Sequence, residues 1–387
     1  MIFTQAPFLV FFVITAALFF AGPRAWRRAV LAISGLLFYA WQAAGYLPLV
    51  MGMILATAWT SGRAGAWINA AALVGVMAWF KCRAATVTVM PGAPQQIVGL
   101  GASLMPLGLS FLAFELIHVA IERRKGRIDR PALISLAAFA LFAPCRVAGP
   151  IKRFPAFDRS IDEASWSASQ LYRGLVRVLQ GLLKKVLLAD TLALAVPQLH
   201  FATSTASAWL ALLAYSWYLY LDFSAYSDIA IGLSSILGVK VPENFRFPYA
   251  SRNLREFWTR WHMSFSSWLG DYVFLPVSTW LALGRPHLPP RGAAMLGYLV
   301  TFLICGLWHG LAWHFVAWGL FHGVLLCAFA EFVARRSRDA NRSAWSWLTD
   351  LGARLATFLV VTWGWLLFAL EWPRAVRLAA LLVGWTR

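Results

Sequence analysis

Long runs of apolar residues recur along most of the chain and are separated by short polar segments. Because these runs are continuously apolar rather than alternating, and several approach the ~20 residues that a helix needs to cross a bilayer, they favour transmembrane helices over a transmembrane barrel. The pattern predicts an all-α polytopic membrane protein with about ten or eleven crossings. The runs cover residues 6–21, 29–44, 47–60, 66–80, 97–121, 132–148, 209–237, 293–310, 312–334 and 351–371, with a last one at 375–386.

Basic residues gather in the short loops between these runs, as at 24–28, 122–130 and 335–342. Loops rich in Lys and Arg face the cytoplasm, so we expect the loop after the first run inside and the N-terminus outside. The run at 171–196 differs because it is apolar yet carries four basic side chains. It predicts an amphipathic interfacial or re-entrant helix, with a solvated loop helix as the alternative.

The composition fits a membrane protein. Of the 387 residues, 60% are hydrophobic and only 13% are charged, against about 25% charged in soluble domains. The net charge of +18 lies in loops next to apolar runs, so we expect contact with anionic lipid and no nucleic-acid partner. The four cysteines form no CxxC pair, which argues against a disulfide framework or a zinc site. No internal repeat divides the chain, and we predict a single membrane-embedded domain over 1–387.

Three histidines lie in the apolar stretch 305–323. If this stretch were one helix, His309, His314 and His322 would not share a face, because an offset of five residues turns a helix by about 140°. The HExxH spacing of many zinc sites is also absent. We therefore expect no metal site here.

The glycines of the same stretch are regularly spaced. Gly306 and Gly310 are four residues apart, as are Gly319 and Gly323. This spacing lets helix backbones approach closely, so it predicts that His309 is surrounded by protein. An ionisable side chain at such depth is a functional candidate, with a structural hydrogen bond to a neighbouring helix as the alternative.

Two acids interrupt the apolar run at 209–237. Asp222 and Tyr226 are one helical turn apart, and Asp228 follows within the same segment. Because buried acids must be paired or protonated, these groups either lock helices together or orient a catalytic group.

The longest polar insertion, 239–271, mixes arginines with aromatic side chains and contains FWTRWH at 257–262. Arg252, Arg255 and Arg260 suit a phosphate-bearing ligand at the membrane surface, because guanidinium groups bind phosphate oxygens in pairs. A juxtamembrane stretch that only contacts lipid is the alternative.

FWTRWH, together with WHG at 308–310 in a later apolar run, resembles the membrane-bound O-acyltransferase (MBOAT) superfamily. Similarity to its bacterial branch, which modifies alginate, peptidoglycan, cellulose and teichoic acid, extends over about 30–325. It is carried by MPLGLSFLAFE (105–115), VAGPIKRF (147–154), GLLKKVLLAD (181–190), YLDFSAYSDIAIGLSSILG (220–238) and PENFRFPYASRNLREFWTRWHMSFSSWLGDYVFLP (242–276).

The resemblance implies a ring of tilted helices with a central tunnel, plus re-entrant or interfacial helices. It makes His309 the catalytic histidine and His262 the second signature position. We assign donor binding to Arg252, Arg255, Trp258, Arg260 and Trp261, and a supporting network to Asp222, Tyr226, Asp228 and Trp308.

Acyl transfer from a thioester needs a base that takes the proton of the incoming hydroxyl, and we expect desolvation to keep the His309 ring neutral for this task. By the resemblance the protein is a multi-pass enzyme of the bacterial inner membrane. It would pass an acyl group, acetyl from acetyl-CoA, to a cell-envelope polysaccharide or a periplasmic relay protein. Acyl-CoA is then a substrate, with no bound cofactor or metal. A proton-coupled transporter and a lipid acyltransferase of the same superfamily are the alternatives.

Overall fold

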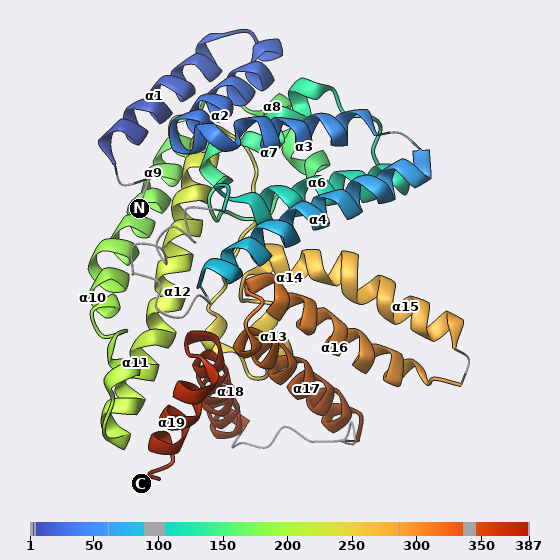
Figure 1. The fold of residues 1–387 in the computed structure, drawn as a ribbon. Coiled ribbons are helices and arrows are strands. Elements are labelled where there is room, and N and C mark those ends of the chain that lie inside the picture. Colours follow the sequence, from blue (N-terminus) through green and yellow to red (C-terminus); the bar gives the residue numbers. More distant parts are fainter. Residues whose placement is uncertain are drawn as a thin grey trace. The chain divides into compact units, whose positions relative to one another are not determined.

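The computed structural model describes residues 3, 5–60, 62–88, 105–285, 287–335 and 346–385. Within these ranges all regular elements are helices (Figure 1). Contacts divide the chain into two compact units, one of Met1–Leu183 with Ala225–Glu243 and the other of Lys184–Ser224 with Asn244–Arg387. The helix α12 (Thr205–Ile236) supplies residues to both. The predicted single domain and the ring with a central tunnel stay predictions.

Five helical stretches of the described residues are long and apolar enough to cross a membrane. The helix α1 (Ala6–Ala21) matches the expected run 6–21 but is shorter than a standard crossing. Of the expected run 97–121, residues 97–104 lie outside the described part of the chain. The all-α polytopic membrane class is confirmed, with fewer standard spans than the sequence predicted. The five stretches are Arg24–Trp59, Ala64–Arg83, Pro290–His309, Trp313–Val333 and Thr349–Ala369.

The first unit is built from closely approaching helix pairs. Between α2 (Arg27–Ala43) and α7 (Leu133–Leu141), a Cβ built onto Gly35 would overlap the carbonyl oxygen of Leu141. Between α9 (Ala168–Leu183) and α12, a Cβ built onto Gly232 would lie 2.7 Å from the carbonyl oxygen of Gly174. Only glycine permits such backbone contact. Besides α1 and the end of α12, this unit contains α2 (Arg27–Ala43), α3 (Leu47–Trp59), α4 (Gly62–Thr88), α6 (Leu109–Arg124), α7 (Leu133–Leu141), α8 (Phe154–Glu163) and α9 (Ala168–Leu183).

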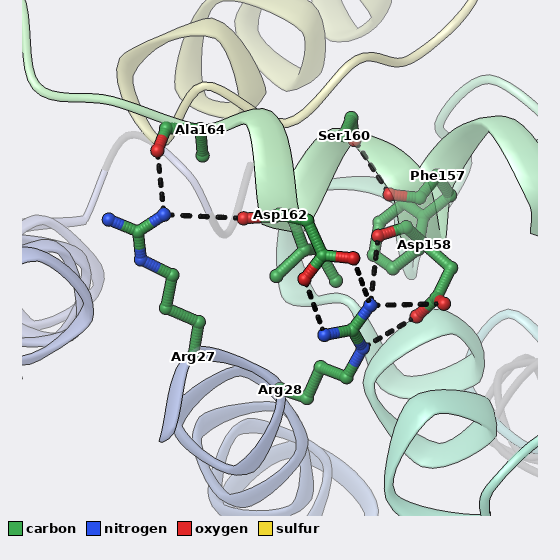
Figure 2. Close-up of polar contacts among 8 residues, drawn as sticks. Arg27, Arg28, Phe157, Asp158, Ser160, Asp162 and Ala164 are labelled. Atoms are coloured by element: carbon green, nitrogen blue, oxygen red, sulfur yellow. Dashed lines mark hydrogen bonds and ion pairs between the residues drawn. The ribbon is translucent and has the colours of Figure 1, made fainter. Parts of the chain in front are cut away.

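Two arginines at the start of α2 bind the end of α8 (Figure 2). Arg27 is buried and donates a hydrogen bond of 2.6 Å to the carbonyl oxygen of Ala164. Arg28 forms ion pairs with Asp158 at 2.8 Å and with Asp162 at 2.7 Å. The basic loop after α1 therefore caps the C-terminal end of α8, where the carbonyl groups carry partial negative charge.

The run at 132–148 does not form a membrane-spanning helix. Its helix α7 has nine residues, so it is about 14 Å long against a hydrocarbon core of about 30 Å. Pro144 follows within three residues of its end and cannot continue the helical hydrogen bonds. The crossing predicted at 132–148 is therefore wrong.

The amphipathic segment at 171–196 is helical. Leu175, Leu179 and Leu183 are about half exposed along one face of α9, whereas Gly174 and Gly181 are buried on the opposite face. The outward face of α9 is thus apolar, as suits contact with lipid. The amphipathic helix is confirmed, and its interfacial or re-entrant position stays a prediction.

The second unit holds a row of antiparallel helices, α15 (Leu275–Gly284), α16 (Pro290–His309) and α17 (Trp313–Arg335), which run side by side in Figure 1. Pro290 occupies the first turn of α16, where its missing N–H has no helical partner to lose. The remaining elements are a π-helical turn (Lys184–Ala189), α10 (Asp190–Ala193), α11 (Gln198–Phe201), the first part of α12, α13 (Leu254–Trp258), α14 (Met263–Leu269), a second π-helical turn (Gly270–Phe274), α18 (Ser346–Ala369) and α19 (Trp372–Leu382).

Candidate active site

His309 is the last residue of α16, and the chain turns at the extended Gly310 before α17 begins at Trp313. The stretch 305–323 is therefore two helices joined by a tight turn, and the comparison of its histidines on a single helix does not apply. His309 lies at the end of one helix, whereas His314 and His322 belong to the next.

The structure contains the close helix contact that the glycine spacing predicts. A Cβ on Gly306 would overlap the carbonyl oxygen of Phe315, and one on Gly319 would lie 3.2 Å from the Cα of Gly306. The backbones of α16 and α17 therefore touch at these glycines, one turn before His309. The predicted close packing of the two helices is confirmed.

Aromatic rings surround the His309 imidazole. The ring centroids of Trp308, Phe368 and Trp318 lie 4.4, 4.8 and 5.1 Å from its own, and the last two rings stand nearly perpendicular to it. His309 itself stays partly exposed. The aromatic walls fix the orientation of the ring and shield it from water, while an open side remains for a reactant.

His262 is held by a specific hydrogen bond. Its Nδ1 lies 3.0 Å from Oδ1 of Asn244, and the same oxygen accepts from the backbone N–H and the hydroxyl of Ser264. Since this oxygen is an acceptor for Ser264, Nδ1 of His262 carries the proton and Nε2 is the basic nitrogen. Burial lowers the pKa of His262 to about 3, so the ring is neutral.

His262 also has an unusual backbone conformation. Its φ of 45° is in the left-handed region, and it immediately precedes α14. Such a conformation costs a non-glycine residue about 1–2 kcal/mol, so the surrounding contacts must hold it. The backbone N–H of Met263 donates to the carbonyl oxygen of Asn244 at 2.9 Å and contributes to this hold.

The two predicted catalytic histidines both lie close to one indole. The Trp308 ring centroid is 4.4 Å from that of His309 and 6.3 Å from that of His262. The Phe265 ring packs against the same indole in a tilted arrangement, with the ring centroids 4.3 Å apart. The fold thus brings together His309, His262 and Trp308, which the sequence had placed in two separate motifs.

The predicted donor-binding arginines have different surroundings. Arg252 pairs with Asp350 at 2.9 Å, and Arg260 pairs with Glu256 at 2.5 Å. Arg255 forms no ion pair with any described residue, and it lines a cavity. Arg255 is therefore the arginine of the three whose charge is available to a ligand.

This cavity, which we call the α13–α16 cavity, has a volume of about 470 Å³ and mostly apolar walls. Trp258 lines it, whereas the predicted Trp261 is buried in an aromatic core against Trp365 at 4.9 Å. Phe302 and Cys305 form its wall on α16, and Cys305 is one turn before His309. The cavity therefore extends along α16 to within one turn of the predicted catalytic base.

The acids assigned to a supporting network pair with bases of the amphipathic segment instead. Asp222 accepts from Lys185 at 2.7 Å, and Asp228 accepts from Arg177 at 2.6 Å. Hydrogen bonds to Asp222 and Asp190 outweigh the effect of burial and raise the pKa of Lys185, so this base stays charged. These contacts favour the alternative in which the acids lock helices together.

Tyr226, the remaining member of that network, accepts a hydrogen bond of 3.2 Å from the backbone N–H of Val147. It thereby ties α12 to the loop that follows α7, within the first unit. This contact, like those of the two acids, is structural in character, and a catalytic role for Tyr226 stays a prediction.

Sequence reasoning missed two groups. Asn244 lies in the quoted stretch 242–276, yet only the fold reveals that it orients His262. In the first unit, Glu115 and Lys152 form a fully buried ion pair at 2.5 Å, and His118 accepts a hydrogen bond from the backbone N–H of Phe154. Glu115 and Lys152 belong to the quoted stretches 105–115 and 147–154, and His118 lies three residues after the first of them. The two stretches therefore meet in space.

The other histidines of the hairpin have packing roles. His314 lies with Nδ1 3.0 Å from the carbonyl oxygen of Leu367, and His322 is fully buried between Trp258 and Trp318. In the part of the chain that the structure describes, no three His, Cys, Asp or Glu side chains gather in a metal-binding arrangement.

Comparison with known proteins decides the family. The model of the MBOAT, membrane-bound O-acyltransferase family, matches residues 35–371. The chain belongs to this family. The resemblance seen in the motifs is thereby confirmed, and the protein is an acyltransferase.

Three relatives illustrate the range of the family. The chain is 34% identical to the probable alginate O-acetylase AlgI of Pseudomonas aeruginosa, over 96% of this chain and 72% of the relative. It is 32% identical to the teichoic acid D-alanyltransferase of Bacillus subtilis, over 68% of each chain. It is 28% identical to the peptidoglycan O-acetyltransferase of Helicobacter pylori, over 95% of this chain and 75% of the relative.

Proposed function

We propose that this membrane-bound O-acyltransferase moves an acetyl group from a cytoplasmic thioester, acetyl-CoA, to a hydroxyl group of a cell-envelope polysaccharide or of a periplasmic relay protein. The bacterial inner membrane is the proposed location. The relatives support this, since a probable alginate O-acetylase and a peptidoglycan O-acetyltransferase match almost the whole chain. The observation that carries the proposal is the position of His309 at the end of α16, one turn beyond Cys305 in the wall of the α13–α16 cavity.

The proposed reaction uses His309 as a general base. The imidazole takes the proton of the acceptor hydroxyl while the hydroxyl oxygen attacks the thioester carbonyl carbon. The new C–O bond forms, the C–S bond breaks, and the thiolate leaves and takes up the proton from the imidazolium. A positioned base of this kind contributes about 10²- to 10⁴-fold in rate.

The donor is proposed to occupy the α13–α16 cavity. Its volume of about 470 Å³ lies in the range of small-molecule sites, about 300–1,000 Å³. Its apolar walls suit the pantetheine arm of a coenzyme A thioester, and Arg255 on its lining suits a phosphate group. The indole N–H of Trp258 is buried and has no hydrogen-bond partner among the described residues, so it is a further donor for this ligand.

His262 is proposed to act on the donor side of the same site. A neutral ring with its proton on Nδ1 accepts a hydrogen bond at Nε2 and does not donate one there. The ring is therefore unsuited to polarising a carbonyl oxygen of the donor, and because His262 is only 3% exposed, its proposed role is to shape the wall of the site. Through Trp308, which contacts both rings, His262 also supports the orientation of His309.

The test compares His309→Ala with His314→Ala, a change of the partly buried histidine in the same hairpin. Both variants are purified in lipid nanodiscs, checked for thermal stability, and supplied with acetyl-CoA and envelope glycan. Release of free thiol and glycan acetylation by mass spectrometry are measured. We expect His309→Ala to lose at least about 100-fold in rate and His314→Ala to retain most of it. Acetylation by His309→Ala at the wild-type rate would reject the assigned base.

A further inference from the structure

The first unit contains a second cavity, which no part of the proposed reaction uses. It has a volume of about 340 Å³ and lies where the end of α3, the start of α4 and the end of α6 meet (Figure 1). Arg123, Arg124 and Arg130 line it, with Asp129 as the one carboxylate among its lining residues. We call it the basic cavity.

The three arginines are oriented by neutral groups. Arg123 donates to the carbonyl oxygen of Thr57 at 2.8 Å, and Arg130 donates to that of Ala58 at 3.1 Å. Both bind the last turn of α3, whose carbonyl groups have no helical partners. Each of these bonds uses one guanidinium N–H, and four others remain on each side chain.

Arg124 is held differently, with its guanidinium carbon 4.6 Å from the ring centroid of Trp67. The neighbouring bases of the same loop contrast with these three, because Lys125 and Arg127 both pair with Glu122. The cavity therefore gathers three positive charges against one negative charge, whereas the two adjacent bases share the carboxylate of Glu122. Burial and the nearby charge of Arg130 lower the pKa of Arg123, in keeping with this crowding of like charges.

The surroundings indicate where an anion would come from. Trp59 and Trp67, on the helices beside the cavity, are 69% and 51% exposed. Exposed Trp side chains next to basic residues are typical of the level of lipid headgroups. The loop at 122–130 is also one of the loops whose charge predicts a cytoplasmic position, where anionic lipids face the protein.

We propose that the basic cavity binds a phosphate group, supplied by an anionic phospholipid headgroup or by a soluble phosphate compound. Planar guanidinium groups that converge on one site match phosphate oxygens in pairs. A bound phosphate neutralises the excess charge and joins the ends of α3 and α6. The site is independent of the acyl-transfer site, which lies in the other unit.

The test measures binding to the purified full-length protein by native mass spectrometry and by thermal shift. The probes are phosphatidylglycerol, phosphatidylcholine as the lipid without net charge, and inorganic phosphate. The double variant Arg124→Gln/Arg130→Gln removes two cationic side chains of the cavity. Arg127→Gln is the matched control, because Arg127 belongs to the same loop but pairs with Glu122 and does not line the cavity.

We expect phosphatidylglycerol to bind more tightly than phosphatidylcholine, and the double variant to bind it about tenfold more weakly, with Arg127→Gln close to wild type. If inorganic phosphate stabilises the wild type and phosphatidylglycerol does not, the soluble source is identified and the site stands. Equal binding by wild type, control and double variant would overturn the proposal. The fold of each variant is checked by circular dichroism. If the double variant unfolds, the single variant Arg124→Gln replaces it, because Arg124 contacts Trp67 and its loss leaves the hydrogen bonds of Arg123 and Arg130 to the last turn of α3 in place.

Discussion

The contact between α16 and α17 gives a sharp test of how the fold positions His309. In Gly319→Ala, the new Cβ would overlap the carbonyl oxygen of Phe302 and lie 3.2 Å from the Cα of Gly306. A carbon and a carbonyl oxygen need about 3.3 Å or more, so the helices must separate by about 1 Å. Overpacking of this kind costs about 1–3 kcal/mol, and displacement of a catalytic group by about 1 Å costs about 100-fold in rate.

The matched control is Gly352→Ala. Gly352 is an exposed residue within α18, and a Cβ there would meet no atom within 4 Å. Thermal unfolding in detergent and acetyl transfer are measured for both variants. We expect Gly319→Ala to melt roughly 3–10 °C below wild type with a large loss of rate, and Gly352→Ala to match or slightly exceed the wild-type stability. Wild-type melting and activity in Gly319→Ala would refute the argument that this close approach sets the position of His309.

Of two further predictions, the first concerns the binding of the donor. Arg255→Ala should raise the KM for acetyl-CoA about tenfold with little change in kcat, because a charge-assisted hydrogen bond to phosphate is lost. The control is Arg246→Ala, which removes an exposed arginine of the same segment that does not line the α13–α16 cavity. An unchanged KM in Arg255→Ala would contradict the assignment. The second concerns pH. The folded protein holds His262 neutral with its pKa lowered to about 3 by burial, whereas the unfolded chain takes up a proton below its usual pKa of about 6.5. The stability contributed by the neutral ring is therefore present above about pH 6.5 and is lost as the pH falls toward 3, by about 2 kcal/mol at pH 5. His262→Asn, which tolerates the left-handed backbone, should show a smaller drop in melting temperature between pH 7 and pH 5 than wild type, and equal drops in both proteins would argue against a buried neutral His262.

The elements that depend on local residue pattern could be predicted from the sequence. Apolar runs of sufficient length predicted α1, α16 and α17 to within about three residues, because a helix in a membrane must satisfy its own backbone. The alternation of leucines and bases predicted the amphipathic α9. The spacing of the glycines at 306, 310, 319 and 323 predicted close helix contact, which the structure shows at Gly306 and Gly319. The motifs around His262 and His309 identified the family.

Which of these groups meet depends on how the helices pack. The histidines at 262 and 309 lie in separate sequence motifs, and the fold brings both rings to the indole of Trp308. Arg252 and Arg255 look equivalent in the sequence, yet an ion pair with Asp350, almost one hundred positions away, occupies the first and leaves the second at the α13–α16 cavity. Hydrogen bonds and ion pairs between distant residues depend on how helices pack, and the residue pattern along one helix does not specify its partner.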